Sequence, residues 1–196
     1  MRQLRIVLWI AVALALLAGG YLLINPKRQT PSTNTIELAR MGGPFTLVGS
    51  EGQPFSSAKL NGKPYALFFG FTHCPDVCPT TLARLVKLRQ QVGGERPFEI
   101  VFVTVDPERD GPAEVGKYTE LFDSPILGLT GSPAQIDQVK KQFGIFSEKV
   151  EQPGGDYSVN HTSTVLLFDR SGKFGGTIAP EEQDDAAIAK LKMVSA

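Results

Sequence analysis

The stretch YALFFGFTHCPDVCPTT, residues 65–81, contains both cysteines of this 196-residue chain. Its first seven residues form a continuous apolar run, which is typical of a strand buried on both faces of a sheet. From 79 to 92 the apolar residues recur at helical spacing, and a pair of glycines ends the pattern. Cys74 and Cys78 are therefore predicted to lie where a buried strand gives way to a helix.

The segments around this stretch alternate between strand and helix patterns. GSEG and DRSG each separate two short strand patterns, as in hairpins. The predicted strands are 45–48, 53–55, 65–71, 98–105, 164–168 and 173–178, and the predicted helices are 79–92, 113–122, 133–143 and 184–193. This alternation predicts an α/β fold with a mixed central sheet flanked by helices. The order of its elements resembles the thioredoxin fold.

The first 24 residues are predicted to form an uncleaved membrane anchor. Residues 6–24 carry no charge, and as a helix they would span roughly 28 Å, close to the bilayer core of about 30 Å. The alternative is a cleaved signal peptide, because AVALALLAGG offers small residues for cleavage. Residues 25–40 are polar and are predicted to be a flexible tether. The domain at 41–196 is then expected on the periplasmic or equivalent exported side of an inner membrane that the chain crosses once.

Charge excludes one class of partner for the exported domain. Four of the 20 Lys and Arg side chains precede residue 37, so residues 37–196 carry 16 basic against 20 acidic side chains, a net charge of −4. A mildly acidic domain without a basic run has no electrostatic basis for binding nucleic acid.

Four uses of Cys74 and Cys78 compete: a structural disulfide, a redox pair, a peroxide-reactive thiol and a metal clamp. A helix start favours the thiolate, because backbone N–H groups and the helix dipole stabilise negative charge there. Thiolates attack disulfides and bind soft metals. Three residues separate the cysteines, and one helical turn still lets two sulfurs meet. A disulfide across so short a loop would stabilise the fold little, but the spacing leaves redox and metal roles open.

The chain has two histidines, His73 and His161. His73 is predicted to pack or to hydrogen-bond at the end of its strand. His161 precedes a predicted strand, in the segment where thioredoxin-like oxidoreductases carry a cis-proline that faces their cysteines. Residues 159–163 contain no proline. Two thiolates and one imidazole would form a soft three-ligand site, which selects copper over hard cations. Zinc is the alternative, although structural zinc usually takes four ligands.

The segments GFTHCPDVCPTTL, VTVDPERDGP and NHTSTVLLFDRSGKF resemble the Sco/SenC family, with YTELF and LGLTG between the last two. These are exported thioredoxin-fold proteins that bind copper and help assemble the dinuclear copper centre of cytochrome c oxidase. The resemblance implies that Cys74, Cys78 and His161 bind copper as Cu(I), Cu(II) or both. It also implies that the two cysteines form a redox-active disulfide.

The resemblance also places Asp106 and Asn160 near the ligands. The family commonly has aspartate directly before the histidine, and an amide at Asn160 would orient the ring less strongly. The implied function is that of a membrane-tethered copper chaperone rather than an enzyme. Its partner would be the copper-receiving subunit of cytochrome c oxidase or another copper chaperone. The alternative, a thiol–disulfide reductase acting on the cysteines of the oxidase copper site, requires both cysteines but not His161; a peroxidase of the peroxiredoxin kind is a third reading.

Overall fold

A computed structural model describes Trp9, Val12 and residues 41–196 of the chain. The chain divides into two units, Met1–Glu37 and Leu38–Ala196, and the fold described below belongs to the second. Apart from Trp9 and Val12, the predicted anchor and tether lie outside the described residues. Within the described part of the chain, no helix is long and apolar enough to cross a bilayer.

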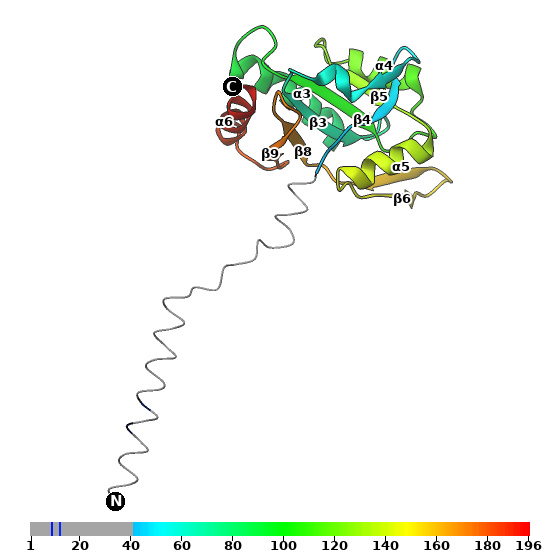
Figure 1. Cartoon of the computed structure of the whole chain (residues 1–196). Helices are drawn as coiled ribbons and strands as arrows, with labels where there is room; N and C mark the ends of the chain where they lie inside the picture. Colours follow the sequence, from blue (N-terminus) through cyan, green and yellow to red (C-terminus); the bar gives the residue numbers. More distant parts are fainter. Residues whose placement is uncertain (1–8, 10–11, 13–40) are drawn as a thin grey trace, which may run out of the picture. The chain divides into compact units, whose positions relative to one another are not determined.

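A seven-stranded mixed sheet forms the centre of the domain (Figure 1), as predicted. Its strand order is β2-β1-β5-β4-β3-β8-β9. β3, β4 and β5 are parallel, while β8 runs antiparallel to β3 and β1 runs antiparallel to β5. The strands are β1 Thr46–Gly49, β2 Pro54–Ser56, β3 Tyr65–Gly70, β4 Glu99–Thr104, β5 Leu127–Thr130, β8 Val165–Phe168 and β9 Phe174–Ile178.

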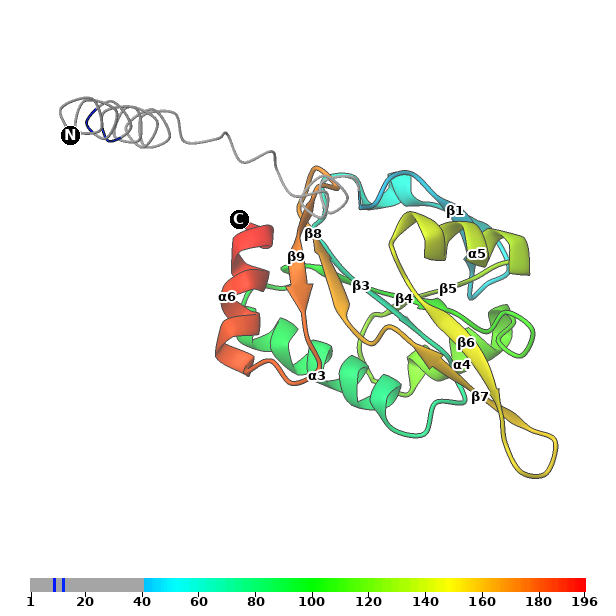
Figure 2. The same ribbon diagram turned by 90° about the horizontal axis from the view of Figure 1, so that it is seen from below.

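Helices cover both faces of this sheet (Figure 2). They are α3 Val77–Val92, α4 Pro112–Glu120, α5 Pro133–Gln142 and α6 Asp184–Ser195, with a short 3-10 helix at Ser57–Leu60. Neighbouring side chains of β3 show the two faces: Phe68 contacts Phe102, which packs on Tyr118 of α4, whereas Phe69 contacts Phe143 at the end of α5. Burial on both faces explains why β3 is apolar throughout.

Three strands were not predicted. β5 is a central strand between β1 and β4. β6 (Ser147–Glu151) and β7 (Tyr157–His161) pair antiparallel as a separate two-stranded sheet. This β6–β7 hairpin lies before the predicted strand at 164–168, in a segment for which no element was predicted, and it carries His161 at its end.

Candidate metal centre

The cysteine motif lies at the carboxyl end of β3, where the chain turns into α3. Cys74 belongs to the turn and is partly buried, whereas Cys78 is the second residue of α3 and is fully buried. The Cys78 backbone N–H donates a hydrogen bond to Cys74 Sγ at 3.4 Å. Because N–H groups at a helix start lack partners within the helix, this contact favours a thiolate at Cys74. Both cysteines are free thiols here.

A buried carboxylate fixes the turn that precedes Cys74. Asp110 is fully buried and accepts hydrogen bonds from the Thr72 backbone N–H at 2.9 Å and the Thr72 hydroxyl at 2.6 Å. The Thr104 hydroxyl, at the end of β4, donates to the same carboxylate at 2.6 Å. Asp110 therefore ties the turn to the neighbouring strand. It was not among the predicted site residues, and its place just after a buried strand is the signal that points to it.

His161 reaches the same place from the end of β7. Its Nδ1 lies 3.0 Å from the Thr162 carbonyl oxygen. Because a carbonyl can accept but not donate, this contact favours the proton on Nδ1. Nε2 then keeps its lone pair, and it lies 3.4 Å from Cys78 Sγ. The rings of Phe68 and Phe71 contact the imidazole edge to face at centroid distances of 6.1 and 5.8 Å, which holds its orientation.

The three predicted ligands therefore come together. One ring nitrogen of His161 and the Sγ atoms of Cys74 and Cys78 all lie within 4.8 Å of one another. Bonds from a metal to sulfur or imidazole nitrogen measure about 2.0–2.3 Å, so ligands that share an ion lie roughly 3.5–4.5 Å apart. A small contraction would place all three around one ion. Two sulfurs and one imidazole are a donor set for a soft metal.

The two thiols differ in acidity. A hydrogen bond from the Cys78 thiol lowers the pKa of Cys74 to about 4, against the opposing effect of burial, and His161 and two backbone N–H groups lower it further. The same hydrogen bond, together with burial, raises the pKa of Cys78. The first proton is therefore lost from the partly exposed sulfur. Cys74 is therefore the more acidic and the more exposed of the two thiols.

Asp106 lies farther out than the ligands. It is buried, and its carboxylate accepts hydrogen bonds from the Tyr157 hydroxyl at 2.9 Å and from Arg109 Nε at 2.6 Å. The Arg109 guanidinium also stacks on the Tyr157 ring, 3.7 Å from its centroid. Asp106 therefore contacts the first residue of β7 rather than the ligands themselves. It holds the strand that ends in His161.

Asn160 and His73 both lie at the surface. Successive side chains of a strand point to opposite sides, so Asn160 faces away from the His161 ring. Within the described residues, no hydrogen bond joins the Asn160 amide to that ring, and the Thr162 carbonyl orients it instead. His73 Nδ1 lies 3.0 Å from the Thr72 hydroxyl, in line with the predicted hydrogen bond at the strand end. His73 stays outside the ligand group.

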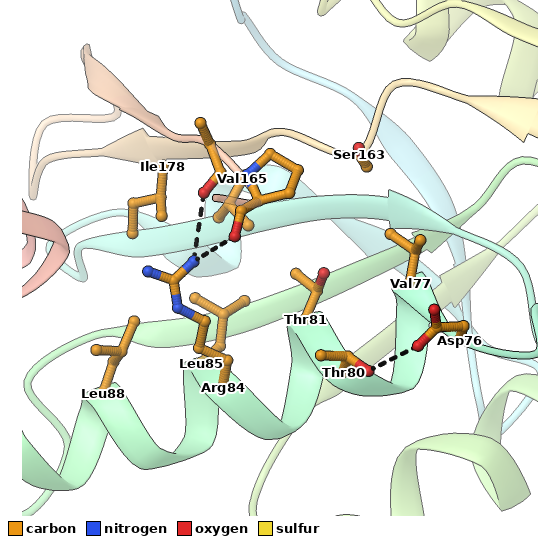
Figure 3. A pocket seen from close by; sticks show the side chains of 12 residues that line it. Asp76, Val77, Thr80, Thr81, Arg84, Leu85, Leu88, Ser163, Val165 and Ile178 are labelled. Carbon is orange, nitrogen blue, oxygen red and sulfur yellow. Dashed lines mark hydrogen bonds between the residues drawn. The ribbon is translucent and has the colours of Figure 1, made fainter. Parts of the chain in front are cut away.

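A groove of about 150 Å³ adjoins the centre along α3 (Figure 3). Apolar side chains of α3, β8 and β9 line much of it, and Val77, next to Cys78, lies at one end. The Arg84 guanidinium is engaged by the carbonyl oxygens of Ala179 and Pro180, at 3.3 and 3.2 Å. The groove therefore offers a mainly apolar surface along α3, and none of the three candidate ligands lines it.

Residues 33–196 match the SCO1/SenC family model. Protein SCO2, mitochondrial, of Saccharomyces cerevisiae is 31% identical over 193 residues, which cover 92% of this chain and 64% of the yeast protein. A SCO2-like protein of Rickettsia conorii is 33% identical over 180 residues, which cover 86% of this chain and 87% of that protein. The chain thus spans less than two thirds of the yeast relative.

Solved structures show the same fold. ScoI of Bradyrhizobium japonicum with copper bound is 38% identical, with a TM-score of 0.71, and covers 79% of this chain and 99% of that one. Yeast Sco1 with copper bound is 30% identical, with a TM-score of 0.69, and the match covers 77% of this chain and 86% of that one. BsSco is described as a member of the Sco family of cytochrome c oxidase assembly proteins. It is 27% identical, with a TM-score of 0.59, and the match covers 78% of this chain and 92% of that one. In sequence and in fold, this chain belongs to the SCO1/SenC family.

Proposed function

We propose that this chain binds copper through Cys74, Cys78 and His161 and delivers it during assembly of the dinuclear copper centre of cytochrome c oxidase. The convergence of two sulfurs and one imidazole nitrogen within 4.8 Å carries the proposal. The copper-bound relatives support the choice of metal, and the oxidase assembly role of BsSco supports the destination.

The donor set suits transfer as well as binding. Thiolates favour Cu(I), and the imidazole also suits Cu(II), so the site can hold either oxidation state. A copper ion with three protein ligands can still accept a fourth ligand. Cys74 is partly exposed, so a thiol of the recipient can join the ion from that side before the ligands of this chain leave. The recipient would be the copper-receiving oxidase subunit or another copper chaperone.

The proposed anchor at 1–24 and tether at 25–40 would keep the 41–196 domain near a membrane-embedded oxidase, on the exported side. Fractionation of cells that express the full chain or a chain without residues 1–24 tests this arrangement. The full chain should stay with the membranes after carbonate extraction, and the shortened chain should be released. A full chain released by carbonate would contradict the anchor.

A copper titration tests the function itself. The reduced full-length chain in detergent should take up one Cu(I) in competition with a chromophoric chelator. His161→Ala should weaken binding at least tenfold, because changes to groups that merely support ligands already cost about 10–100-fold. Oxidation of Cys74 and Cys78 to a disulfide should abolish binding, because a disulfide offers no thiolate. Undiminished affinity in the oxidised chain would exclude the proposed site.

The difference in acidity between the thiols favours a second candidate, a thiol–disulfide reductase. The Cys74 thiolate would attack a disulfide of the oxidase copper site and form a mixed disulfide. The Cys78 thiolate would then release the substrate as two thiols and leave Cys74–Cys78 oxidised, to be reduced again by an external dithiol. His161→Ala separates the candidates. Lost copper binding with unchanged reduction of a model disulfide would show that both chemistries share the cysteines.

A further inference from the structure

Two neighbouring surface loops, at 57–63 and 169–173, gather basic side chains. The loops lie side by side, because the Gly62 backbone N–H donates a hydrogen bond to the Arg170 carbonyl oxygen at 2.9 Å. Their basic residues are all exposed, and within the described part of the chain none of them forms a salt bridge. We call these four residues the basic loop pair: Lys59, Lys63, Arg170 and Lys173.

The charge of the two loops is opposite to that of the domain. Their one acidic residue is Asp169, so the loops carry four basic against one acidic side chain, a net charge of +3. Residues 37–196 as a whole carry −4, which leaves −7 for the rest. An anionic surface would therefore attract this part of the domain and repel the remainder.

A hollow of about 270 Å³ is lined by both loops and by the start of β4. Lys63 and Arg170 line it, together with Arg96, which is paired with Glu99 at 2.6 Å. The Arg170 guanidinium is held in place, because its Nη2 donates to the Ser195 carbonyl oxygen at 3.0 Å. Ammonium and guanidinium groups that border one hollow are hydrogen-bond donors suited to the oxygens of a phosphate group.

The chain enters the domain beside the basic loop pair. Gly43 and Pro44, near the start of the described domain, line a second hollow together with Ser57 of one loop and Ser171 of the other. The proposed tether at 25–40 leads to this point and has a random-coil reach of roughly 20 Å. The two loops therefore belong to the part of the domain that the tether would hold closest to a membrane.

The metal centre lies at the other end of the sheet. Tyr65, at the start of β3, pairs with Phe168, just before the second loop, whereas Gly70, at the end of β3, lies against Cys78. Six residues of strand separate the two ends by roughly 20 Å. Figure 2 shows the turn between β8 and β9 at one side of the domain and the β6–β7 hairpin at the other. A domain that rested on its basic loops would hold the metal centre away from the surface beneath it.

We propose that the basic loop pair rests on anionic lipid headgroups of the bilayer, with one headgroup phosphate in the hollow between Lys63 and Arg170, and so turns the metal centre away from the membrane. The inference rests on the membrane anchor of the proposed function, but it does not depend on the metal. Lipid is favoured over an acidic protein, because the loops lie where the chain leads toward the bilayer. Each basic side chain near an anionic bilayer surface strengthens attachment roughly fivefold.

Lysine acylation of the full-length chain in lipid nanodiscs tests the proposal. Discs of phosphatidylcholine alone are compared with discs that also contain phosphatidylglycerol, and mass spectrometry follows the reaction with an uncharged succinimidyl ester. Lys59 should react about tenfold more slowly in the anionic discs, and about 1 M salt should remove the difference. Lys149, exposed on the β6–β7 hairpin, should react at the same rate in both. Inorganic phosphate added to neutral discs should not protect Lys59, which distinguishes a lipid headgroup from free phosphate.

A pair of charge variants isolates the loops from the rest of the chain. Lys63→Gln/Lys173→Gln should weaken attachment roughly 30-fold, so Lys59 should react in anionic discs as it does in neutral ones. Lys87→Gln/Lys117→Gln is the matched control, because it removes the same charge from exposed positions on α3 and α4. The control should keep the wild-type protection of Lys59.

Equal Lys59 rates in the two kinds of disc would overturn the inference, and so would wild-type protection in Lys63→Gln/Lys173→Gln. A copper titration of the same chains separates this result from the copper site, since the loop variant should bind Cu(I) like the wild type. A chain that binds no copper but shows lipid-dependent protection of Lys59 refutes the copper function and supports the inference. A chain that does not enter the discs refutes the anchor, and its sedimentation with phosphatidylglycerol vesicles, lost or kept in the loop variant, then decides whether the loops bind lipid.

Discussion

Gly70 is the last residue of β3 and lies directly against Cys78, so Gly70→Ala tests how closely the sheet fixes the ligand sulfur. The added Cβ would lie 2.8 Å from Cys78 Sγ, 3.0 Å from the Phe102 ring and 3.1 Å from the Phe68 ring. The φ angle of Gly70 lies outside the left-handed region, so alanine meets no backbone strain there. The effect of the substitution is therefore one of contact.

The size of the effect follows from these distances. Heavy atoms out of bonding contact sit best about 3.5–4.0 Å apart, so the sulfur must move by roughly 0.7–1.2 Å. Metal sites hold their ligand distances to about 0.2 Å, a much smaller range. We expect Gly70→Ala to weaken copper binding about 10–100-fold, as when supporting groups are changed. Overpacking should also lower the free energy of unfolding by about 1–3 kcal/mol.

Chelator competition and urea denaturation of the full-length chain measure the two effects. Gly49→Ala is the matched control, because a Cβ there meets the Gln53 carbonyl oxygen at 3.6 Å, an ordinary contact. The control should bind copper like the wild type. Wild-type copper affinity in Gly70→Ala would refute the reasoning, because it would show that the position of Cys78 Sγ against β3 does not govern the site.

Three other changes act on different parts of the centre. Asp110→Asn keeps the side-chain shape but removes the charge of the carboxylate, whose oxygens accept three hydrogen bonds. The free energy of unfolding should therefore fall by about 2–3 kcal/mol, and copper affinity should drop. Stability equal to that of the wild type in urea denaturation would contradict this prediction. In the reduced metal-free chain, Cys74 has a pKa of about 4 and stays a thiolate as the pH falls, so its alkylation rate, followed by mass spectrometry, should be flat from about pH 8 to about pH 5 and fall below that. A rate that drops tenfold per unit from about pH 8 downward, as for a free cysteine, would count against the assigned acidity. Tyr157→Phe leaves the buried Asp106 carboxylate without one of its hydrogen-bond donors. Amide hydrogen exchange in the β6–β7 hairpin should therefore become faster, and copper binding should weaken because His161 is held less firmly, while the alkylation rate of Cys74 stays unchanged. Unaltered hydrogen exchange would show that other contacts hold the hairpin.

The sequence pattern predicted the buried strands well because β3 and β4 are covered on both faces and therefore read as continuous apolar runs. β5 was missed because four residues, one of them a glycine, are too few to show a period. Gly128 is required there by a tertiary contact: a Cβ would lie 2.5 Å from Val115 Cγ1 of α4. The local pattern of apolar residues in the sequence cannot predict a contact of this kind.

The β6–β7 hairpin was missed for another reason. Its first strand, SEKVE, is largely exposed and polar, so hydrophobic periodicity carries little signal there. The approach of His161 to the thiols depends on this hairpin, through pairing of Ser147 with His161 and through the Asp106–Tyr157 hydrogen bond. The three candidate ligands could be named from the resemblance to a family, and the structure brings them within 4.8 Å of one another. The local pattern of the chain could not show how the histidine arrives.

The segment that follows β4 ties both halves of the centre together. Asp110 holds the turn that leads to Cys74, and Asp106, four residues earlier, holds the strand that ends in His161. The Thr104 hydroxyl links the two acids, since it accepts from the Asp106 N–H at 2.9 Å and donates to Asp110 at 2.6 Å. The thiols and the imidazole come from parts of the chain more than 80 residues apart, yet each is fixed to the same strand end. Their separation is therefore set by one short buried segment. Because buried networks of this kind resist rearrangement, the proposed copper centre would keep its shape while its ligands exchange.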